Sequence, residues 1–190
     1  HPSENRLLTL LLRYFALFFF DALKDEVTVL GVEFFRGTAD DAVERILEGG
    51  LLVAPSGPGL SKNLIEDSWY GEALDAADIV LPDSGLMVLI WNWIACCGGS
   101  RIKRVSGLEF LTRFLCAPAV KSKLDHSFWI MPSIEENHVN AEWLRKDLDV
   151  HVSGAGTYIA PMYPSIGEIQ DDLLLKNIRE RTPSIIFLNI

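Results

Sequence analysis

A carboxylate at the end of an apolar run is the first candidate for chemistry in this sequence. Asp83 follows residues 79–81, Ile-Val-Leu, and precedes Ser84-Gly85. The apolar run predicts a buried strand, and open α/β sheets bind ligands beyond the carboxyl ends of their strands. A carboxylate there can accept the proton of an attacking hydroxyl group. Asp83 could instead cap the helix expected from Leu86, and the spacing alone leaves both readings open.

A loop rich in glycine and proline is the second candidate. Pro55, Ser56, Gly57 and Gly59 lie in the run Pro-Ser-Gly-Pro-Gly, which follows another apolar run. Because the loop carries little side-chain bulk, its backbone amides can approach a phosphate or a sugar closely. The loop is neither a Walker loop nor a dinucleotide fingerprint, and an ordinary strand-to-helix connection has the same composition.

Arg101, Lys103 and Arg104 form the densest basic cluster of an acidic chain. Guanidinium groups stabilise the negative charge that develops on a nucleoside diphosphate leaving group. A solvated surface turn is the alternative. The formal net charge of -9 makes a nucleic-acid partner improbable, because binding to phosphate backbones depends on positive charge.

The spacing of the histidines and cysteines does not indicate a metal site or a catalytic thiol. The four histidines are scattered, and the three cysteines make neither a disulfide framework nor a zinc site. We therefore expect no metal and no cofactor. Cys116 is expected to be a buried thiol in a reducing compartment.

The elements that must position these residues alternate between short apolar runs and stretches of helical period. This pattern predicts an α/β fold with a Rossmann-like, mainly parallel sheet flanked by helices. Strands are expected at 27–35 (a strand or hairpin), 51–54, 79–81, 128–131, 150–152 and 184–188. Helices are expected at 38–47 with Thr38 as N-cap, from about 61 to 77 in two pieces, 86–97, 108–115, 135–148 and 169–181. The strand at 51–54 is expected to be fully buried, and the helix at 86–97 is expected to be buried.

The chain should form an apolar N-terminal helix over 1–26 and one α/β domain over 27–190. Residues 7–20 are strongly apolar, but Arg13 interrupts them and they fall short of the roughly 20 residues of a membrane span. The helix could pack on the domain or on a partner subunit, giving a homo-oligomer, or it could lie in a membrane interface. Because the chain stops at the last expected strand, we expect it to be truncated at the C-terminal end.

From residue 27 onward the sequence resembles the WecB/TagA/CpsF family of bacterial glycosyltransferases. Five segments in the same order carry the resemblance: 29–32 with 42–45, 54–56, 77–85, 104–108 and 173–188. The resemblance implies an inverting transfer without metal, from a UDP donor carrying an N-acetylhexosamine-type sugar to a lipid-linked acceptor in cell-surface polysaccharide assembly. It also implies a cytoplasmic protein, at or near the inner face of the membrane.

The resemblance assigns roles to individual residues as well. Asp83 corresponds to the family's general base, and Arg104 would hold the diphosphate. Ser84 and Gly85, which follow the base, and Ser106 and Gly107, which follow Arg104, complete the expected substrate-binding set.

The sequence departs from the family pattern at three places. Residues 54–56 are Ala-Pro-Ser where the family commonly has Thr-Pro-Asn, Ser84 replaces a glycine, and Ser106 replaces a threonine. A catalytically inactive module of the same fold, serving nucleotide-sugar binding or assembly, is therefore the alternative function.

Overall fold

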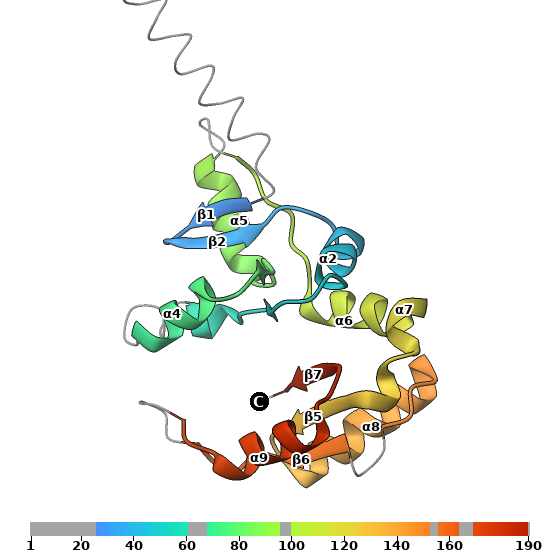
Figure 1. The fold of residues 1–190 in the computed structure, drawn as a ribbon. Helices are drawn as coiled ribbons and strands as arrows, with labels where there is room; N and C mark the ends of the chain where they lie inside the picture. The colour runs from blue at the N-terminus through green and yellow to red at the C-terminus, as the bar shows by residue number, and fades with distance from the viewer. Residues whose placement is uncertain (1–25, 61–67, 96–99, 153–155, 164–168, 190) are drawn as a thin grey trace, which may run out of the picture. The chain divides into compact units, whose positions relative to one another are not determined.

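The computed structural model describes residues 26–60, 68–95, 100–152, 156–163 and 169–189 (Figure 1). The N-terminal helix expected over 1–26 lies outside the described residues, apart from Glu26, which begins a strand. The chain divides into two compact units, His1–Phe110 and Leu111–Ile190. One catalytic domain over 27–190 stays a prediction.

The first unit opens with a β-hairpin. Strands β1 (Glu26–Val29) and β2 (Val32–Phe35) pair antiparallel, with Val29 opposite Val32. Leu30 and Gly31 between them have φ of 55° and 85°. A two-residue turn with both central residues at positive φ matches the twist of the flanking strands. The expectation of a strand or hairpin over this segment is thus confirmed as a hairpin.

Helix α2 (Ala39–Ile46) begins at the residue that the sequence predicts. The Thr38 hydroxyl accepts a hydrogen bond from the Asp41 amide at 3.2 Å, and the Asp41 carboxylate accepts one from the Thr38 amide at 2.7 Å. This reciprocal pair is a capping box, which satisfies donors that a helix start leaves open. Gly49 and Gly50, both at positive φ, follow the helix.

Two short parallel strands lead to the candidate site. Strand β3 (Leu52–Val53) pairs with β4 (Ile79–Val80), and helix α4 (Ser68–Asp75) precedes β4. Both β4 residues and Leu81 are buried, as predicted. The prediction of a fully buried strand over 51–54 is wrong, because Leu51 is exposed and both β3 residues are only half-buried. Within the described part of the chain β3 has β4 as its only strand partner, so one edge of it lacks a covering strand.

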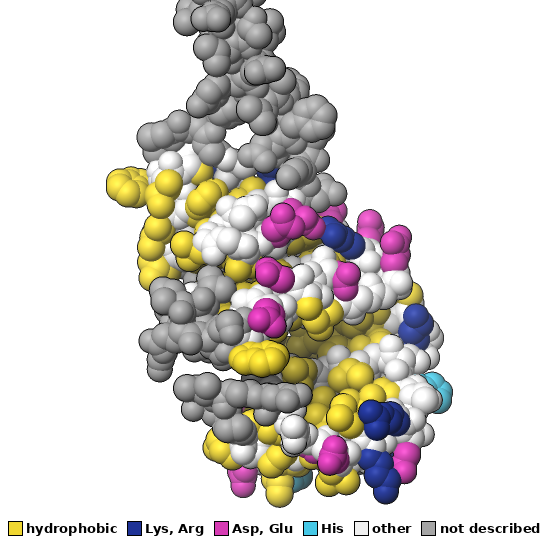
Figure 2. Space-filling view, turned by 60° about the vertical axis from the view of Figure 1, so that its left-hand side comes forward, with side chains coloured by type: hydrophobic (Ala, Val, Ile, Leu, Met, Phe, Trp, Pro, Cys, Tyr) yellow, Lys and Arg dark blue, Asp and Glu magenta, His cyan; other side chains and the backbone are white. Residues whose placement is uncertain are grey.

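Helix α5 (Gly85–Ile94) contradicts the prediction of a buried helix over 86–97. Val88 is its one buried residue, while Trp93 is 76% exposed. Four further apolar side chains of the helix are exposed: Leu86, Leu89, Ile90 and Ile94. A helix that is apolar all round does not reveal which of its faces has a partner. Hydrophobic side chains (yellow) reach the surface in several places in the space-filling view (Figure 2).

The second unit is built on a three-stranded parallel sheet of order β6-β5-β7. Its strands are β5 (Ser127–Met131), β6 (Thr157–Ile159) and β7 (Ile185–Leu188). Its helices are α7 (Pro118–Lys121), the short 3-10 helix η3 (Leu124–His126), α8 (Ile134–Leu148) and α9 (Asp172–Arg181). The strands predicted at 128–131 and 184–188 and the helices at 135–148 and 169–181 are confirmed within a few residues.

The strand predicted at 150–152 is wrong, since the segment after α8 serves to end that helix. Asp149 adopts a left-handed conformation with φ of 54°, and the Val150 amide donates to the Leu144 carbonyl at 3.0 Å. This bond satisfies a carbonyl that the helix end would leave open. Val150 is buried in the core of the unit, and the strand forms later, at β6.

Helix α6 (Gly107–Cys116) corresponds to the helix predicted over 108–115. Leu115 is fully buried beside Trp129, Met131 and Leu144, and Phe187 stacks on Trp129 at a centroid distance of 3.9 Å. Cys116 is exposed, so the prediction of a buried thiol is wrong. Adjacent helical residues point in directions about 100° apart, so burial of Leu115 does not bury its neighbour.

The structure confirms an α/β protein with parallel strands flanked by helices. The described strands form three separate small sheets, so the prediction of one mainly parallel sheet holds only in part. Across the described ranges, no helix is both long enough and apolar enough to cross a membrane.

Candidate functional site

Three loops of the first unit meet at Asp83. The segment 81–84 leaves strand β4, and the Pro82 carbonyl accepts a hydrogen bond from the Val105 amide at 3.3 Å. This bond places residues 104–107 beside Asp83. The loop 54–60, which leaves the neighbouring strand β3, is the third member of the group. Since β3 and β4 are parallel, their carboxyl ends deliver both loops to the same edge of the sheet.

Asp83 is held by three donors from the segment 104–107. The Arg104 Nη2 atom donates to Asp83 Oδ1 at 2.8 Å, and Arg104 Nε donates to the Asp83 carbonyl at 2.6 Å. The Gly107 amide donates to Asp83 Oδ2 at 3.1 Å. The Asp83 side chain is nevertheless 26% exposed, so the carboxylate is neither sealed in the interior nor free in solvent.

The helix cap at this point is Ser84. Its hydroxyl accepts a hydrogen bond from the Met87 amide at 3.3 Å, which is the N-cap contact of α5. Asp83 therefore lies one residue before the cap, with its carboxylate directed to Arg104 and Gly107. The capping reading of Asp83 that the sequence left open is therefore wrong, and its catalytic role stays a prediction.

The glycine-proline loop turns directly into a helical segment that begins at Gly57. The Ser56 hydroxyl accepts from the Gly59 amide at 3.3 Å, and the Ser56 carbonyl accepts from the Leu60 amide at 3.0 Å. A Cβ atom at Gly57 would lie 3.0 Å from the Ser84 hydroxyl, so this loop lies against the start of α5. Pro55 is buried and anchors the loop rather than presenting a side chain to a ligand.

Gly107 is a tight point of the site. A Cβ atom there would lie 2.9 Å from the Ala54 Cβ atom and 3.3 Å from Asp83 Oδ2. Gly107 thus lies close to both Ala54 and Asp83. Gly85 is roomier, because its Cβ atom would meet the aliphatic part of Arg104 at 3.6 Å, an ordinary contact distance.

The structure brings together most of the residues predicted for the site: Pro55, Ser56, Gly57, Gly59, Asp83, Ser84, Gly85, Arg104, Ser106 and Gly107. Ser106 takes part through its backbone, since its carbonyl accepts from the Phe110 amide at the start of α6 at 2.9 Å. Of the three basic residues, Arg104 is the one with a described contact to Asp83.

Tyr70 is a residue of this site that the sequence did not indicate. Its hydroxyl lies 2.6 Å from where a Cβ atom of Gly59 would be, so the phenol borders the glycine-proline loop. Burial raises the pKa of Tyr70 above its usual value, so the hydroxyl keeps its proton and can donate a hydrogen bond. A tyrosine in the first turn of helix α4 carries no local signal for such a role.

The second unit holds a polar cluster around Asp171, the N-cap of α9. The Tyr158 and Tyr163 hydroxyls donate to its carboxylate at 2.8 and 2.7 Å, and the Leu174 amide donates at 2.9 Å. The Leu174 amide and the Tyr163 hydroxyl lower the pKa of Asp171. Burial, together with the bond to Asp171, raises the pKa of Tyr163 to about 12. The cluster ties the segment before α9 to strand β6 and was not predicted.

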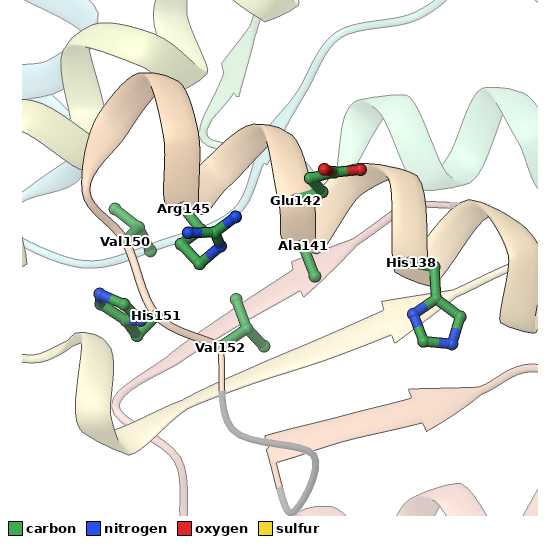
Figure 3. A pocket seen from close by; sticks show the side chains of 7 residues that line it. All are labelled: His138, Ala141, Glu142, Arg145, Val150, His151 and Val152. Carbon is green, nitrogen blue, oxygen red and sulfur yellow. The ribbon is translucent and has the colours of Figure 1, made fainter.

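An open hollow of about 360 Å³ lies on the second unit (Figure 3). Four of its lining residues belong to α8 and three to the segment that follows: His138, Ala141, Glu142, Arg145, Val150, His151 and Val152. Glu142 is paired with Lys146 at 2.6 Å, and both side chains are more than half exposed. Both histidines of the hollow, His138 and His151, are exposed.

A metal centre is not formed by the described residues, since they include no group of three or more His, Cys, Asp or Glu side chains arranged to hold an ion. In comparisons with known proteins, the model of the Glycosyl transferase WecG/TagA/CpsF family matches residues 27–190. No curated protein matches the chain.

Proposed function

Because the chain belongs to the WecG/TagA/CpsF family of glycosyltransferases, we propose that it moves an N-acetylmannosamine-type sugar from a UDP donor to a lipid-linked saccharide. Membership of the family makes the protein a glycosyltransferase of polysaccharide biosynthesis. The choice of donor sugar and acceptor is the proposal. The observation that carries the proposed transfer to a hydroxyl group is the carboxylate of Asp83, held in place yet 26% exposed where three loops meet.

The proposed reaction is a single displacement with inversion at the anomeric carbon. The acceptor hydroxyl attacks that carbon and passes its proton to Asp83, while the bond from the carbon to the diphosphate oxygen breaks. The electron pair leaves with UDP, and no covalent intermediate with the protein forms. The resemblance assigns the diphosphate to Arg104, whose side chain is 54% exposed, and this role stays a prediction.

The backbone of the glycine-proline loop is the proposed binding surface for the donor. Gly57 and Gly59 leave little side-chain bulk there, so a sugar or a phosphate can approach the chain closely. Tyr70 borders this loop, and its hydroxyl adds a hydrogen-bonding group to the proposed binding site for the UDP-sugar. Oligomerisation through the apolar N-terminal segment and a position at the inner membrane face stay predictions.

The test is substitution of the proposed base. Asp83→Asn should abolish sugar transfer and leave the thermal unfolding profile close to that of the wild type. The matched control is Asp75→Asn, which removes an exposed carboxylate at the end of α4 and should leave turnover unchanged. Turnover assayed with UDP-N-acetylmannosamine and a lipid-linked N-acetylglucosamine acceptor would exclude Asp83 as the base if Asp83→Asn matched the wild type.

UDP binding provides a second measurement that does not depend on catalysis. A ligand that binds only the folded state stabilises it by about 2.7 kcal/mol at 100 times its dissociation constant. UDP should therefore raise the melting temperature of the wild type and of Asp83→Asn alike. If millimolar UDP shifts neither protein, the proposed donor is wrong.

An inactive nucleotide-sugar-binding module is the second candidate, and Ala54 is the observation that favours it. Ala54 lies close to Gly107, whose amide donates to the Asp83 carboxylate, and the family commonly has a threonine at the position of Ala54. The chain thus lacks one hydrogen-bonding group next to the proposed base. UDP binding without turnover, with transfer appearing in Ala54→Thr, would support this candidate.

A further inference from the structure

Arg104 contacts Asp83 at two points with one guanidinium group. Its Nε atom donates to the Asp83 carbonyl at 2.6 Å and its Nη2 atom to the carboxylate at 2.8 Å. Contacts to both the main chain and the side chain of one residue fix the side chain relative to the main chain. These contacts engage two of the five N–H groups of the guanidinium with Asp83, so the geometry gives Arg104 a task other than binding the leaving group.

The Gly107 amide completes the hold on Asp83. It donates to Oδ2 at 3.1 Å, while Arg104 Nη2 donates to Oδ1. Each carboxylate oxygen can accept more than one hydrogen bond, so both retain capacity for a further donor. An aspartate held from two sides, with part of its side chain still exposed, presents the remaining lone pairs in a defined direction.

We propose that Arg104 is a positioning residue for Asp83, holding the carboxylate in the orientation in which it receives the proton of the acceptor hydroxyl. This inference rests on the proposed function, in which Asp83 is the base. Arg104 itself neither gains nor loses a proton in the step. The task requires the planar fork of arginine, because lysine supplies a point charge that cannot reach both atoms in the same geometry.

Kinetics separate this role from binding of the diphosphate. A misplacement of about 1 Å in a reacting group can cost about 100-fold in rate. We therefore expect Arg104→Gln and Arg104→Lys to lower kcat by roughly 10- to 100-fold. The affinity for UDP, measured by calorimetry, and the KM for the donor should both change by less than about threefold.

Amide exchange tests the positioning without any turnover. The Gly107 amide has the Asp83 carboxylate as its described acceptor, so its protection reports where that carboxylate lies. Arg104→Gln should speed hydrogen exchange at Gly107 by roughly tenfold, the scale of one lost hydrogen bond, and Asp83→Ala, which removes the acceptor, should act similarly. The matched control is Arg179→Gln, which removes an exposed arginine of helix α9 in the second unit and should change neither exchange nor kcat.

The kinetic, affinity and exchange measurements together decide whether Arg104 positions Asp83 or binds the diphosphate. A fall in kcat with unchanged UDP affinity and faster Gly107 exchange supports the proposal. A loss of UDP affinity of tenfold or more, with Gly107 exchange unchanged, overturns it and assigns Arg104 to the diphosphate. If the wild type shows no transfer, the proposed function is refuted. Faster Gly107 exchange in Arg104→Gln would in that case still show that Arg104 positions the Asp83 carboxylate.

Discussion

Gly107→Ala is the substitution for which the structure makes the sharpest prediction. The new methyl group would lie 2.9 Å from the Ala54 Cβ atom and 3.3 Å from Asp83 Oδ2. The alanine Cβ atom is bonded directly to the backbone and no side-chain rotation can move it, so relief requires movement of one of the two backbones. The first turn of α6 must then shift relative to the loop after β3.

Two opposing contributions set the change in unfolding free energy caused by Gly107→Ala. Alanine is favoured over glycine within a helix by up to about 1 kcal/mol. Overpacking at a tight contact costs about 1–3 kcal/mol. Because the contact lies inside normal van der Waals distance and involves no flexible side chain, the overpacking cost should prevail. We expect a net loss of stability on the order of 1 kcal/mol.

Urea unfolding of four variants tests whether the contact with the Ala54 methyl group causes the loss of stability. Gly107→Ala should be less stable than the wild type, whereas Gly107→Ala placed on Ala54→Gly should cost nothing relative to Ala54→Gly alone. Gly85→Ala is the control, since it also starts a helix but meets Arg104 at 3.6 Å, and it should be neutral or stabilising. The reasoning is refuted if Gly107→Ala is as stable as the wild type, or if removing the Ala54 methyl group gives no relief.

Two further predictions concern the second unit. Leu115→Ala should cost about 2–5 kcal/mol in urea unfolding because Leu115 is fully buried, whereas Cys116→Ala should change stability by less than about 0.5 kcal/mol. The folded state raises the pKa of Tyr163 to about 12, so it favours the neutral phenol. Stability should therefore fall as the pH rises from about 10 to 12, and melting temperatures should fall less in Tyr163→Phe.

The parts of the fold that follow local rules could be predicted from the sequence. Thr38 and Asp41 encode a helix start within four residues, and the structure has that start. The apolar residues 79–81 predicted a buried strand, and they are buried. In such cases the deciding interactions lie within a few residues of chain, so the sequence contains them.

Burial of α5 and the strand after α8 could not be predicted, because each depends on distant partners. The sequence of α5 is apolar on every side, so no periodicity distinguishes a covered face from an exposed one. Val150 and Val152 have the β-branched character of a strand, yet the Val150 amide is used to end α8. A hydrogen bond to the end of the preceding helix takes precedence over strand propensity there.

The candidate site shows the same division between local and long-range information. Sequence reasoning found the residue types, but Arg104 is separated from Asp83 by 21 positions, and nothing between them shows that the two side chains meet. The sequence reading assigned Arg104 to the leaving group and left Asp83 without a partner. Because Arg104 contacts Asp83 and is proposed to orient its carboxylate toward the acceptor, the two residues act as one unit. Their effects on rate should then be non-additive, and Arg104→Gln should cost little more once Asp83→Asn has been made.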